Sequence, residues 1–366
     1  MVVSKRSCIT VSFYLAYFTF IMFSMLGHIP TLGGYLKELT NFGLALFVII
    51  ICIRLRDYSS KEGIAIAVFF LYGLFLALRT KDYGIFKLSI MIFAAKGMDF
   101  RKCVKFDLYS RVILTVVLLV LFNRGIAPDV TSYYNGTLRH SIGFQNPNHV
   151  GMDAFVIIAE ILYVSNMKFT FMKFFMVFGI LFVSDRIAGS RTAEMITIIM
   201  ISLSILYAYW PQIYQKKAID ITVKWGAAIC SVATWAAVFL YRNGNSFAAM
   251  LNVALSNRIE NISYHYSMFG MSLFGNDISV ANRTLDSLYG YLYISLGIVA
   301  FVIYIFFYQL LQGKLYSKNK PLAIIIFCFF LYGLSERLWS YIDYNVFMLS
   351  FAELIYSGFT DDKGKK

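Results

Sequence analysis

Residues 8–30 read C-I-T-V-S-F-Y-L-A-Y-F-T-F-I-M-F-S-M-L-G-H-I-P and contain no Asp, Glu, Lys or Arg. About 20 mostly apolar residues are enough for a helix to cross a lipid bilayer. The run is too long for a signal-peptide core and lacks a small-residue cleavage pattern, so we expect a retained helix. Eleven further apolar runs follow, at about 39–53, 63–78, 84–98, 110–123, 150–166, 169–184, 193–210, 221–241, 288–311, 321–336 and 341–357. The sequence therefore predicts an all-α integral membrane protein with about twelve transmembrane helices, built as one multi-pass domain over residues 1–366.

Composition supports this fold class. Hydrophobic residues make up 59% of the chain and charged residues 14%, with a mean hydropathy of +0.67, whereas soluble domains have about 45–50% apolar and about 25% charged residues. The five cysteines show no CxxC or metal-ligand spacing, so we expect neither a disulfide framework nor a metal site. The net charge of +13 is spread over many short loops. That distribution is typical of topology signals and anionic lipid contacts rather than of nucleic-acid binding.

The distribution of basic residues predicts the orientation. If the N-terminus is cytoplasmic, 21 of the 33 Lys and Arg residues face the cytoplasm, with Arg111 counted among them. The positive-inside rule then places both termini in the cytoplasm. The other side has nine Arg and three Lys, and all four histidines lie on that side or at its edge. Arg is suited to bidentate contacts with phosphate or carboxylate, so we expect the chemistry on the outer face.

The most polar segment between the apolar runs is 137–151, T-L-R-H-S-I-G-F-Q-N-P-N-H-V-G. Amide side chains donate and accept hydrogen bonds, so Gln145, Asn146 and Asn148 beside Arg139 could shape a pocket for an anion and sugar hydroxyls. The structural alternative is a turn at Asn-Pro, with Asn148 capping a helix that starts near Val150. Capping would leave Arg139, Gln145 and His149 unexplained, so we favour binding for Arg139.

A second polar segment, S-D-R-I-A-G-S-R-T at 184–192, separates two apolar runs. A helix is expected to start near Ser190 or Thr192, with Glu194 in its first turn. Arg191 would then lie at the positive end of a helix dipole, where a cation is disfavoured structurally but can grip an anion.

The longest outer segment, 242–287, predicts an amphipathic helix along the membrane surface. Its apolar stripe comprises Phe247, Met250, Leu251, Ala254, Leu255, Ile259 and Ile262. Arg258 falls within that stripe, and His265 falls on the same face if the helix continues. An arginine on a buried face indicates a functional site; alternatively it snorkels, or pairs with Asp277 or Asp286.

Two later positions remain open. Asp286 is either a helix cap or a catalytic carboxylate. Glu336 and Arg337 form either an interfacial pair or part of a site.

Taken together, these segments resemble the Wzy-type polysaccharide polymerases, within the wider O-antigen ligase and polymerase superfamily. R-H-S-I-G-F-Q-N-P-N at 139–148 is similar to the family's R-x-x-G-x-x-N-P-N-type signature, and G-S-R-T-A at 189–193 resembles its second arginine motif. L-F-G at 273–275 and L-D-S-L-Y at 285–289 resemble the end of the family's outer loop. Ligases of the superfamily usually have His at the head of that last motif. Asp286 stands there in this chain, which favours a polymerase.

The resemblance implies a GT-C-type glycosyltransferase in the bacterial cytoplasmic membrane, using no metal or other cofactor. Its substrate would be an undecaprenyl-pyrophosphate-linked oligosaccharide, and a flippase and a chain-length regulator are possible partners. On this reading the pyrophosphate is held by Arg139, Arg191 and Arg258, because preorganised donors stabilise the charge on a leaving group. Gln145, Asn146 and Asn148 would line the pocket. The base that accepts the acceptor's proton is Asp286, His265 or His149, and the sequence does not choose among them.

Two alternatives remain open. One is a ligase of the same superfamily, which attaches finished glycan to another acceptor. The other is a transporter or flippase of lipid-linked glycan, for which we expect charged residues at several depths of the bundle interior.

Overall fold

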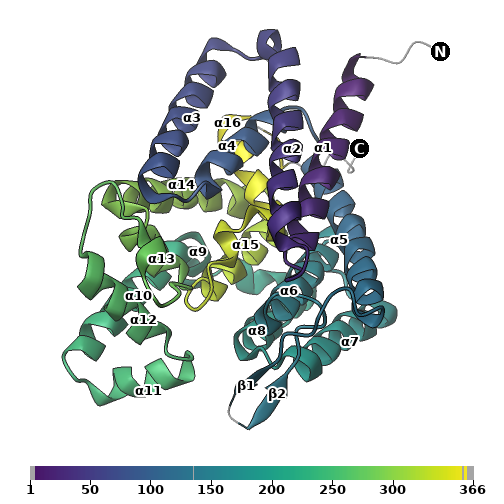
Figure 1. Ribbon diagram of the computed structural model, residues 1–366. Helices are drawn as coiled ribbons and strands as arrows, with labels where there is room; N and C mark the ends of the chain where they lie inside the picture. The colour runs from purple at the N-terminus through teal and green to yellow at the C-terminus, as the bar shows by residue number, and fades with distance from the viewer. Residues whose placement is uncertain (1–4, 135, 357, 361–366) are drawn as a thin grey trace. The chain divides into compact units, whose positions relative to one another are not determined.

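The computed structural model describes residues 5–134, 136–356 and 358–360 (Figure 1). The protein is 76% helical, and the strands found in the described part form one short antiparallel hairpin. The chain divides into two compact units, which are described separately below. Unit 1 comprises residues 1–66, 90–208 and 343–366, and unit 2 comprises residues 67–89 and 209–342.

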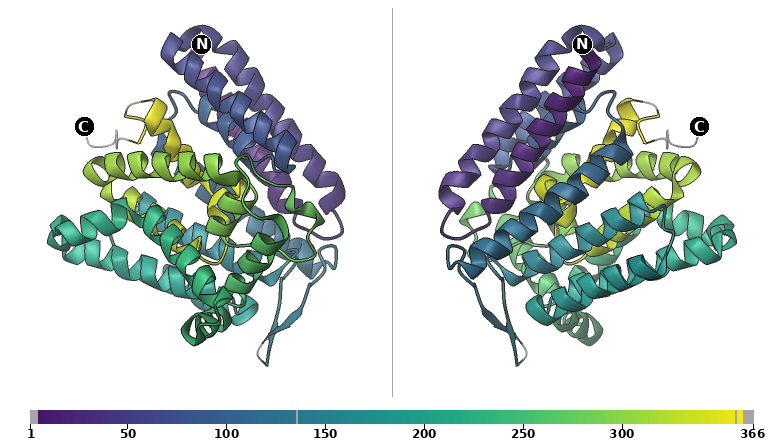
Figure 2. Two further views of the ribbon diagram at one scale, coloured as in Figure 1. Left: turned by 90° about the vertical axis from the view of Figure 1, so that its left-hand side faces the viewer. Right: turned by 90° about the vertical axis from the view of Figure 1, so that its right-hand side faces the viewer.

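Unit 1 is built mainly from long helices. Its elements are α1 (Lys5–Leu26), α2 (Gly33–Ile53), η1 (Leu55–Asp57), α5 (Phe100–Asn123), β1 (Ser132–Tyr134), β2 (Thr137–Arg139), α6 (Pro147–Val164), α7 (Phe171–Ala188), α8 (Arg191–Tyr209), η6 (Val346–Phe351) and α16 (Ala352–Ile355). Helices α1 and α2 lie side by side, and the β1–β2 hairpin projects beyond the helix ends (Figure 2). Helix α6 is the central element, because every residue from Val150 to Tyr163 is buried.

Unit 2 has shorter helices and more turns. Its elements are η2 (Pro211–Gln215), α9 (Lys217–Lys224), α10 (Gly226–Arg242), α11 (Ser246–Ala254), α12 (Arg258–Phe269), η3 (Ile278–Val280), α13 (Leu288–Ile294), α14 (Gly297–Lys318), α15 (Lys320–Tyr332) and η4 (Leu338–Ser340). The division between the units falls within α3 (Ser60–Thr80), α4 (Gly84–Ala94) and η5 (Ile342–Tyr344).

Five helices of the described chain are long and apolar enough to cross a membrane: Ser7–Leu26 of α1, α2, α3, α8 and α14. A sixth span results if α9 and α10, which meet at a bend of 71°, are counted as one. On α3, large apolar side chains at i, i+4, i+7, i+11 and i+14 are exposed: Ile64, Val68, Leu71, Phe75 and Leu78. Such a stripe is expected of a helix that faces lipid. The protein therefore has the architecture of an all-α membrane protein, and the number twelve stays a prediction.

Two expected helices are broken. The run at 288–311 divides into α13 and α14, because Gly297 has φ +89°. A Cβ at the neighbouring Gly275 would lie 2.2 Å from the Ser295 carbonyl oxygen, so the loop 272–276 packs into the break. The amphipathic helix expected in 242–287 is two helices, α11 and α12, because Ser256 and Asn257 have φ of 53° and 64°. The prediction of one continuous amphipathic helix with a single apolar stripe is therefore wrong.

The run at 341–357 also differs from the expectation. Its described residues form the short turns η5 and η6 and the four-residue α16 rather than one long helix. Nevertheless Val346, Phe347, Met348 and Leu349 are buried. This segment is apolar because it packs inside the protein.

Candidate functional site

Arg139 joins the two polar segments of unit 1. It ends β2, and its Nε donates to the Ala188 carbonyl oxygen at 2.5 Å, while Nη2 donates to Oδ1 of Asn148 at 2.5 Å. Gly189 follows α7 with φ +51°, a conformation that favours glycine, and lies against the side chain of Arg139. The segments 137–151 and 184–192, separated in the sequence, are therefore in direct contact. We call Arg139, Asn148, Arg191 and His149 with their supporting loop the loop cluster.

Asp129 organises the loop before Arg139 and was missed by the sequence analysis. Its Oδ1 accepts hydrogen bonds from the amides of Ser141 (2.9 Å) and Ile142 (3.1 Å), and its Oδ2 contacts His140 Nδ1 at 2.6 Å. Partial burial opposes ionisation, but the His140 contact and the two amides hold the pKa of Asp129 below its ordinary value. His140 is therefore positioned by Asp129. The only sequence signal was an acidic residue in a polar, Pro-containing loop, which is too common to be diagnostic.

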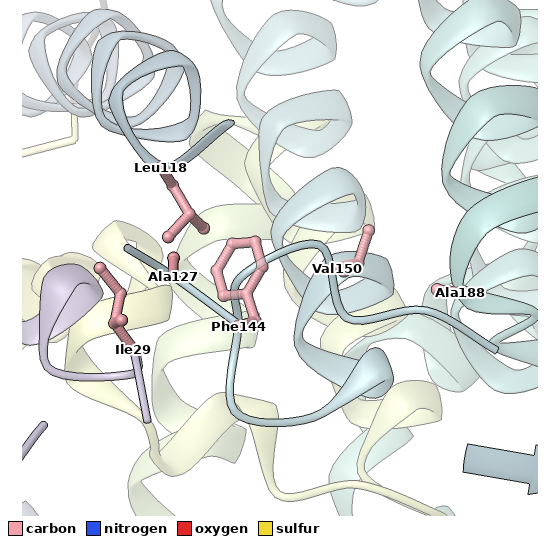
Figure 3. Close-up of a cluster of buried hydrophobic side chains, with 6 residues drawn as sticks. All are labelled: Ile29, Leu118, Ala127, Phe144, Val150 and Ala188. Carbon is pink, nitrogen blue, oxygen red and sulfur yellow. The ribbon is translucent and has the colours of Figure 1, made fainter. Parts of the chain in front are cut away.

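The loop cluster rests on a small apolar core (Figure 3). Phe144 is 1% exposed and anchors the loop among side chains from α5, α6, α7 and the segments that follow α1 and α5: Leu118, Val150, Ala188, Ile29 and Ala127. Gly143 has φ +97°, and a Cβ there would lie 3.0 Å from the Cβ of Ala127. Burial of one aromatic ring is worth about 1.5–3 kcal/mol, so Phe144 fixes the loop to the helices whose ends carry Asn148 and Arg191.

Asn146, not Asn148, caps α6. The helix begins at Pro147, and Oδ1 of Asn146 accepts from the amide of Asn148 at 2.9 Å. Proline at the first helical position suits this arrangement because its missing N–H would be unsatisfied there. The alternative that Asn148 is the cap is therefore wrong, and its side chain is left to accept from Arg139. Gln145, the third residue expected in the pocket, is exposed.

Arg191 is the first residue of α8 and is exposed, as the sequence analysis expected of the start of this helix. The starts of α6 and α8 are close, since a Cβ at Gly151 would lie 2.7 Å from the Cβ of Ser190. Arg139 and Arg191 thus belong to one region of unit 1, beside two helix N-termini. Such termini favour anions through unsatisfied N–H groups.

His149, a candidate base, belongs to an aromatic group. Its ring centroid lies 4.7 Å from that of His28 and 5.7 Å from that of Tyr344, and His28 lies 5.3 Å from Tyr344. His149 is in the first turn of α6, one residue after Asn148. It is half-buried.

In unit 2, Arg258 is held by two carboxylates. It is the first residue of α12, and its guanidinium pairs with Asp286 and, at 2.5 Å, with Glu336. We call these three residues the Arg258 cluster. Burial raises the pKa of Glu336 to about 7, against the lowering effect of Arg258 and with a further raising effect of Asp286. The two carboxylates raise the pKa of Arg258, although burial opposes this.

Asp286 and Glu336 both pair with Arg258. Asp286 does not cap α13, whose N-cap is Ser287, but accepts from Thr284 Oγ1 at 2.8 Å besides pairing with Arg258. Arg337 donates to the Tyr341 hydroxyl at 2.9 Å and lies over the Tyr291 ring. The pairing of Arg258 with Asp286 was one of the alternatives left open by the sequence.

His265 is fully buried beneath this cluster. Its Nε2 lies 3.0 Å from the carbonyl oxygen of Arg283, so Nε2 carries the proton and donates. Burial lowers the pKa of His265. This geometry suits a neutral histidine that holds α12 to the segment before Asp286. Asp286, whose side chain is 21% exposed, and the half-buried His149 are more accessible than His265.

Arg111 was counted among cytoplasmic charges, and that assignment is wrong. It lies within α5, is 0% exposed, and pairs with Asp107 and Asp153. The signal was present, because two acidic residues, Asp153 and Glu160, lie within an apolar run. Ionisable residues in such a run indicate a functional site.

Each cluster presents groups that can bind an oxyanion. The loop cluster combines a bidentate arginine with helix N-termini, whereas the Arg258 cluster has a net charge of −1 unless one carboxyl is protonated. No family model matches the chain, and no curated protein or solved structure is similar to it. The class of protein is therefore defined by fold and composition alone, as an all-α membrane protein.

Proposed function

We propose that this protein is a polysaccharide polymerase of the Wzy type. It would transfer a growing glycan from undecaprenyl pyrophosphate to a lipid-linked repeat unit, at the outer face of a bacterial cytoplasmic membrane. The observation that supports the proposal is the contact of Arg139 with Ala188 and Asn148. It brings together, within one unit, the two segments that resemble the family's arginine motifs.

The chemistry requires charge stabilisation on the leaving pyrophosphate. Arg139 is fixed through its Nε and one Nη2 contact, and Arg191 lies at the start of α8 nearby. Preorganised donors of this kind are worth about 10²–10³ in rate at other sites where negative charge develops. Within the same unit, the half-buried His149 would accept the proton of the acceptor hydroxyl.

The test uses purified full-length protein in lipid vesicles with a lipid-linked repeat unit, and glycan length is the readout. We expect a ladder from the wild type and a loss of about 10²-fold or more from Arg139→Lys, because Lys cannot reproduce the bidentate geometry. Arg186→Lys is the matched control, since Arg186 stacks on Phe182 at the end of α7. Full-length polymer from Arg139→Lys would refute the proposed site.

One observation favours a second candidate, a transporter of lipid-linked glycan. Arg111 and its carboxylate partners are fully buried inside the helices of unit 1. Charges within the bundle interior are typical of transport pathways. Unchanged glycan length with movement of the substrate across the vesicle membrane would support this alternative. Attachment of a finished glycan to a different acceptor would support a ligase.

A further inference from the structure

Four ionisable side chains meet between α5 and α6 in the interior of unit 1. Arg111 on α5 lies 3.1 Å from Asp107 one turn earlier, 3.2 Å from Asp153 and 3.8 Å from Glu160, the last two on α6. Asp107, Arg111 and Glu160 are 0% exposed and Asp153 is 2% exposed. We call these four residues the buried cluster.

The charges of the buried cluster do not balance if every group is ionised. Three carboxylates face one guanidinium, which leaves a net charge of −2 without access to water. In the part of the chain that the structure describes, Arg111 is the only cation paired with these carboxyls. The other titratable groups that face them are neutral when protonated and add no positive charge: Tyr17 of α1, Cys103 of α5 and Tyr344 of η5. Buried charges need partners, so this arrangement favours the binding of a further positive charge.

The hydrogen bonds show which carboxyl oxygens of the buried cluster lack a donor. Asp153 accepts from Arg111 and, at 2.8 Å, from Thr115, and one oxygen of Asp107 accepts from Arg111. Within the described residues, no donor reaches the second oxygen of Asp107 or either oxygen of Glu160, although these two carboxyls are in contact. Two carboxylates in contact repel each other, whereas a protonated carboxyl donates to its neighbour.

A second observation comes from a different helix. The Tyr17 hydroxyl is buried, with the side chain 1% exposed, and it has no hydrogen-bond partner among the described residues. It lies close enough to Asp107, Arg111 and Glu160 for their charges to act on it. A buried hydroxyl without a partner is costly. Its position beside the acceptor-rich side of the cluster shows that the polar site extends to α1.

We propose that the buried cluster is a proton-binding site, in which one proton is shared between Glu160 and Asp107 at neutral pH. The proton forms an O–H bond with one oxygen of Glu160, and that group donates to the free oxygen of Asp107. Asp107 and Asp153 keep their hydrogen bonds from Arg111, and binding one proton reduces the net negative charge of the cluster by one. A proton fits better than a metal ion, because no group of three or more His, Cys, Asp or Glu side chains in the described chain is placed to hold a metal.

The site is connected to the loop cluster through α6. His149 precedes Asp153 by four residues, so the two lie on one face about 6 Å apart along the axis. Loss of the proton would restore two adjacent negative charges between α5 and α6 and weaken the contact of these helices. The proton therefore stabilises the helix whose first turn carries Asn148 and His149. This holds whether or not the proposed glycosyl transfer is correct.

The test is infrared spectroscopy of the full-length protein in lipid vesicles at neutral pH. We expect the wild-type minus Glu160→Gln difference spectrum to contain the C=O stretch of a protonated carboxylic acid, and that band to shift in D₂O. Asp107→Asn should remove or displace the same band. A difference spectrum that contains only carboxylate bands for both variants would overturn the proposal.

Glu353 provides a matched control. It is also a fully buried glutamate of unit 1, but its carboxylate accepts from the amides of Gly358 and Thr360 and from the Thr360 hydroxyl. Glu353→Gln should therefore remove carboxylate bands only. Glutamine at position 160 offers Asp107 a donor of nearly the same shape as a protonated glutamic acid, so Glu160→Gln is expected to assemble normally. Its failure to yield folded protein would also refute the proposal.

Discussion

Lowering the pH should increase the affinity of the Arg258 cluster for a diphosphate. The carboxyl groups of Asp286 and Glu336 both occupy the guanidinium of Arg258, and above pH 7 Glu336 carries a negative charge there. Burial raises the pKa of Glu336 to about 7. Protonation as the pH falls through that value neutralises the cluster and frees part of the guanidinium for an anion.

The magnitude follows from the titration of one group. With a pKa of about 7, the protonated fraction of Glu336 rises from about one-tenth at pH 8 to about nine-tenths at pH 6. If only the protonated form binds, affinity rises about tenfold across this interval, which corresponds to about 1.4 kcal/mol. The slope should vanish below about pH 6, where Glu336 is already protonated. By the same linkage, a bound diphosphate should raise the pKa of Glu336.

The assay is equilibrium binding of a soluble diphosphate diester, whose phosphate charges do not titrate between pH 6 and 8. Glu336→Gln should bind tightly at both pH values, because glutamine mimics the protonated acid. Glu260→Gln is the matched control, since Glu260 pairs with the half-exposed Arg283 and should leave the profile unchanged. Equal wild-type affinity at pH 6 and pH 8, or an unaltered pH dependence in Glu336→Gln, would refute the reasoning.

Three further predictions concern the loop cluster. Asp129→Asn should speed amide hydrogen exchange at Ser141 and Ile142, which donate to this carboxylate. The folded protein lowers the pKa of Asp129, so the stabilisation from its ionised form is present above the unfolded pKa and is lost as the pH falls through the folded pKa. Acid should therefore speed exchange at these amides in the wild type but not in the variant. Asn146→Ala should lower the free energy of unfolding by about 1 kcal/mol through loss of the α6 cap, measured by thermal unfolding. An unchanged free energy of unfolding would exclude that capping role. Gly151→Val should lower the free energy of unfolding by about 1–3 kcal/mol, because its Cβ would lie 2.7 Å from that of Ser190. Gly179→Val on α7 is the control, since a Cβ there meets nothing within 4 Å. Equal thermal stability of the two variants would contradict the close approach of α6 to α8.

Local signals in the sequence were sufficient for several features. The uninterrupted apolar runs predicted α1, α2, α3, α8 and most of α14, and the Ser190–Thr192 segment predicted the start of α8 to within one residue. The polar segment 137–151 was recognised as a connector with its own structure. Its cap was placed two residues too late, because both asparagines are good caps in isolation; Pro147 at the first helical position and the hydrogen bond from the Asn148 amide to Asn146 identify Asn146 as the cap.

The breaks at Ser256–Asn257 and Ser295–Leu296 could not be read from periodicity. The break at Ser256–Asn257 depends on the positive φ of both residues. The other break depends on the positive φ of Gly297 and on the loop 272–276, which packs into the gap. Periodicity reports which residues prefer burial, but it is insensitive to a change of helix direction within an apolar run.

From its sequence alone, this protein is determined to be helical and membrane-embedded, because hydropathy and run length are properties of consecutive residues. The partners of Arg111, Arg139 and Arg258 were decided only by the tertiary structure. Asp153 is 42 residues from Arg111, and Glu336 is 78 residues from Arg258. A charged side chain in an apolar run indicates that a partner must exist. Only the packing of distant segments determines which carboxylate that side chain contacts.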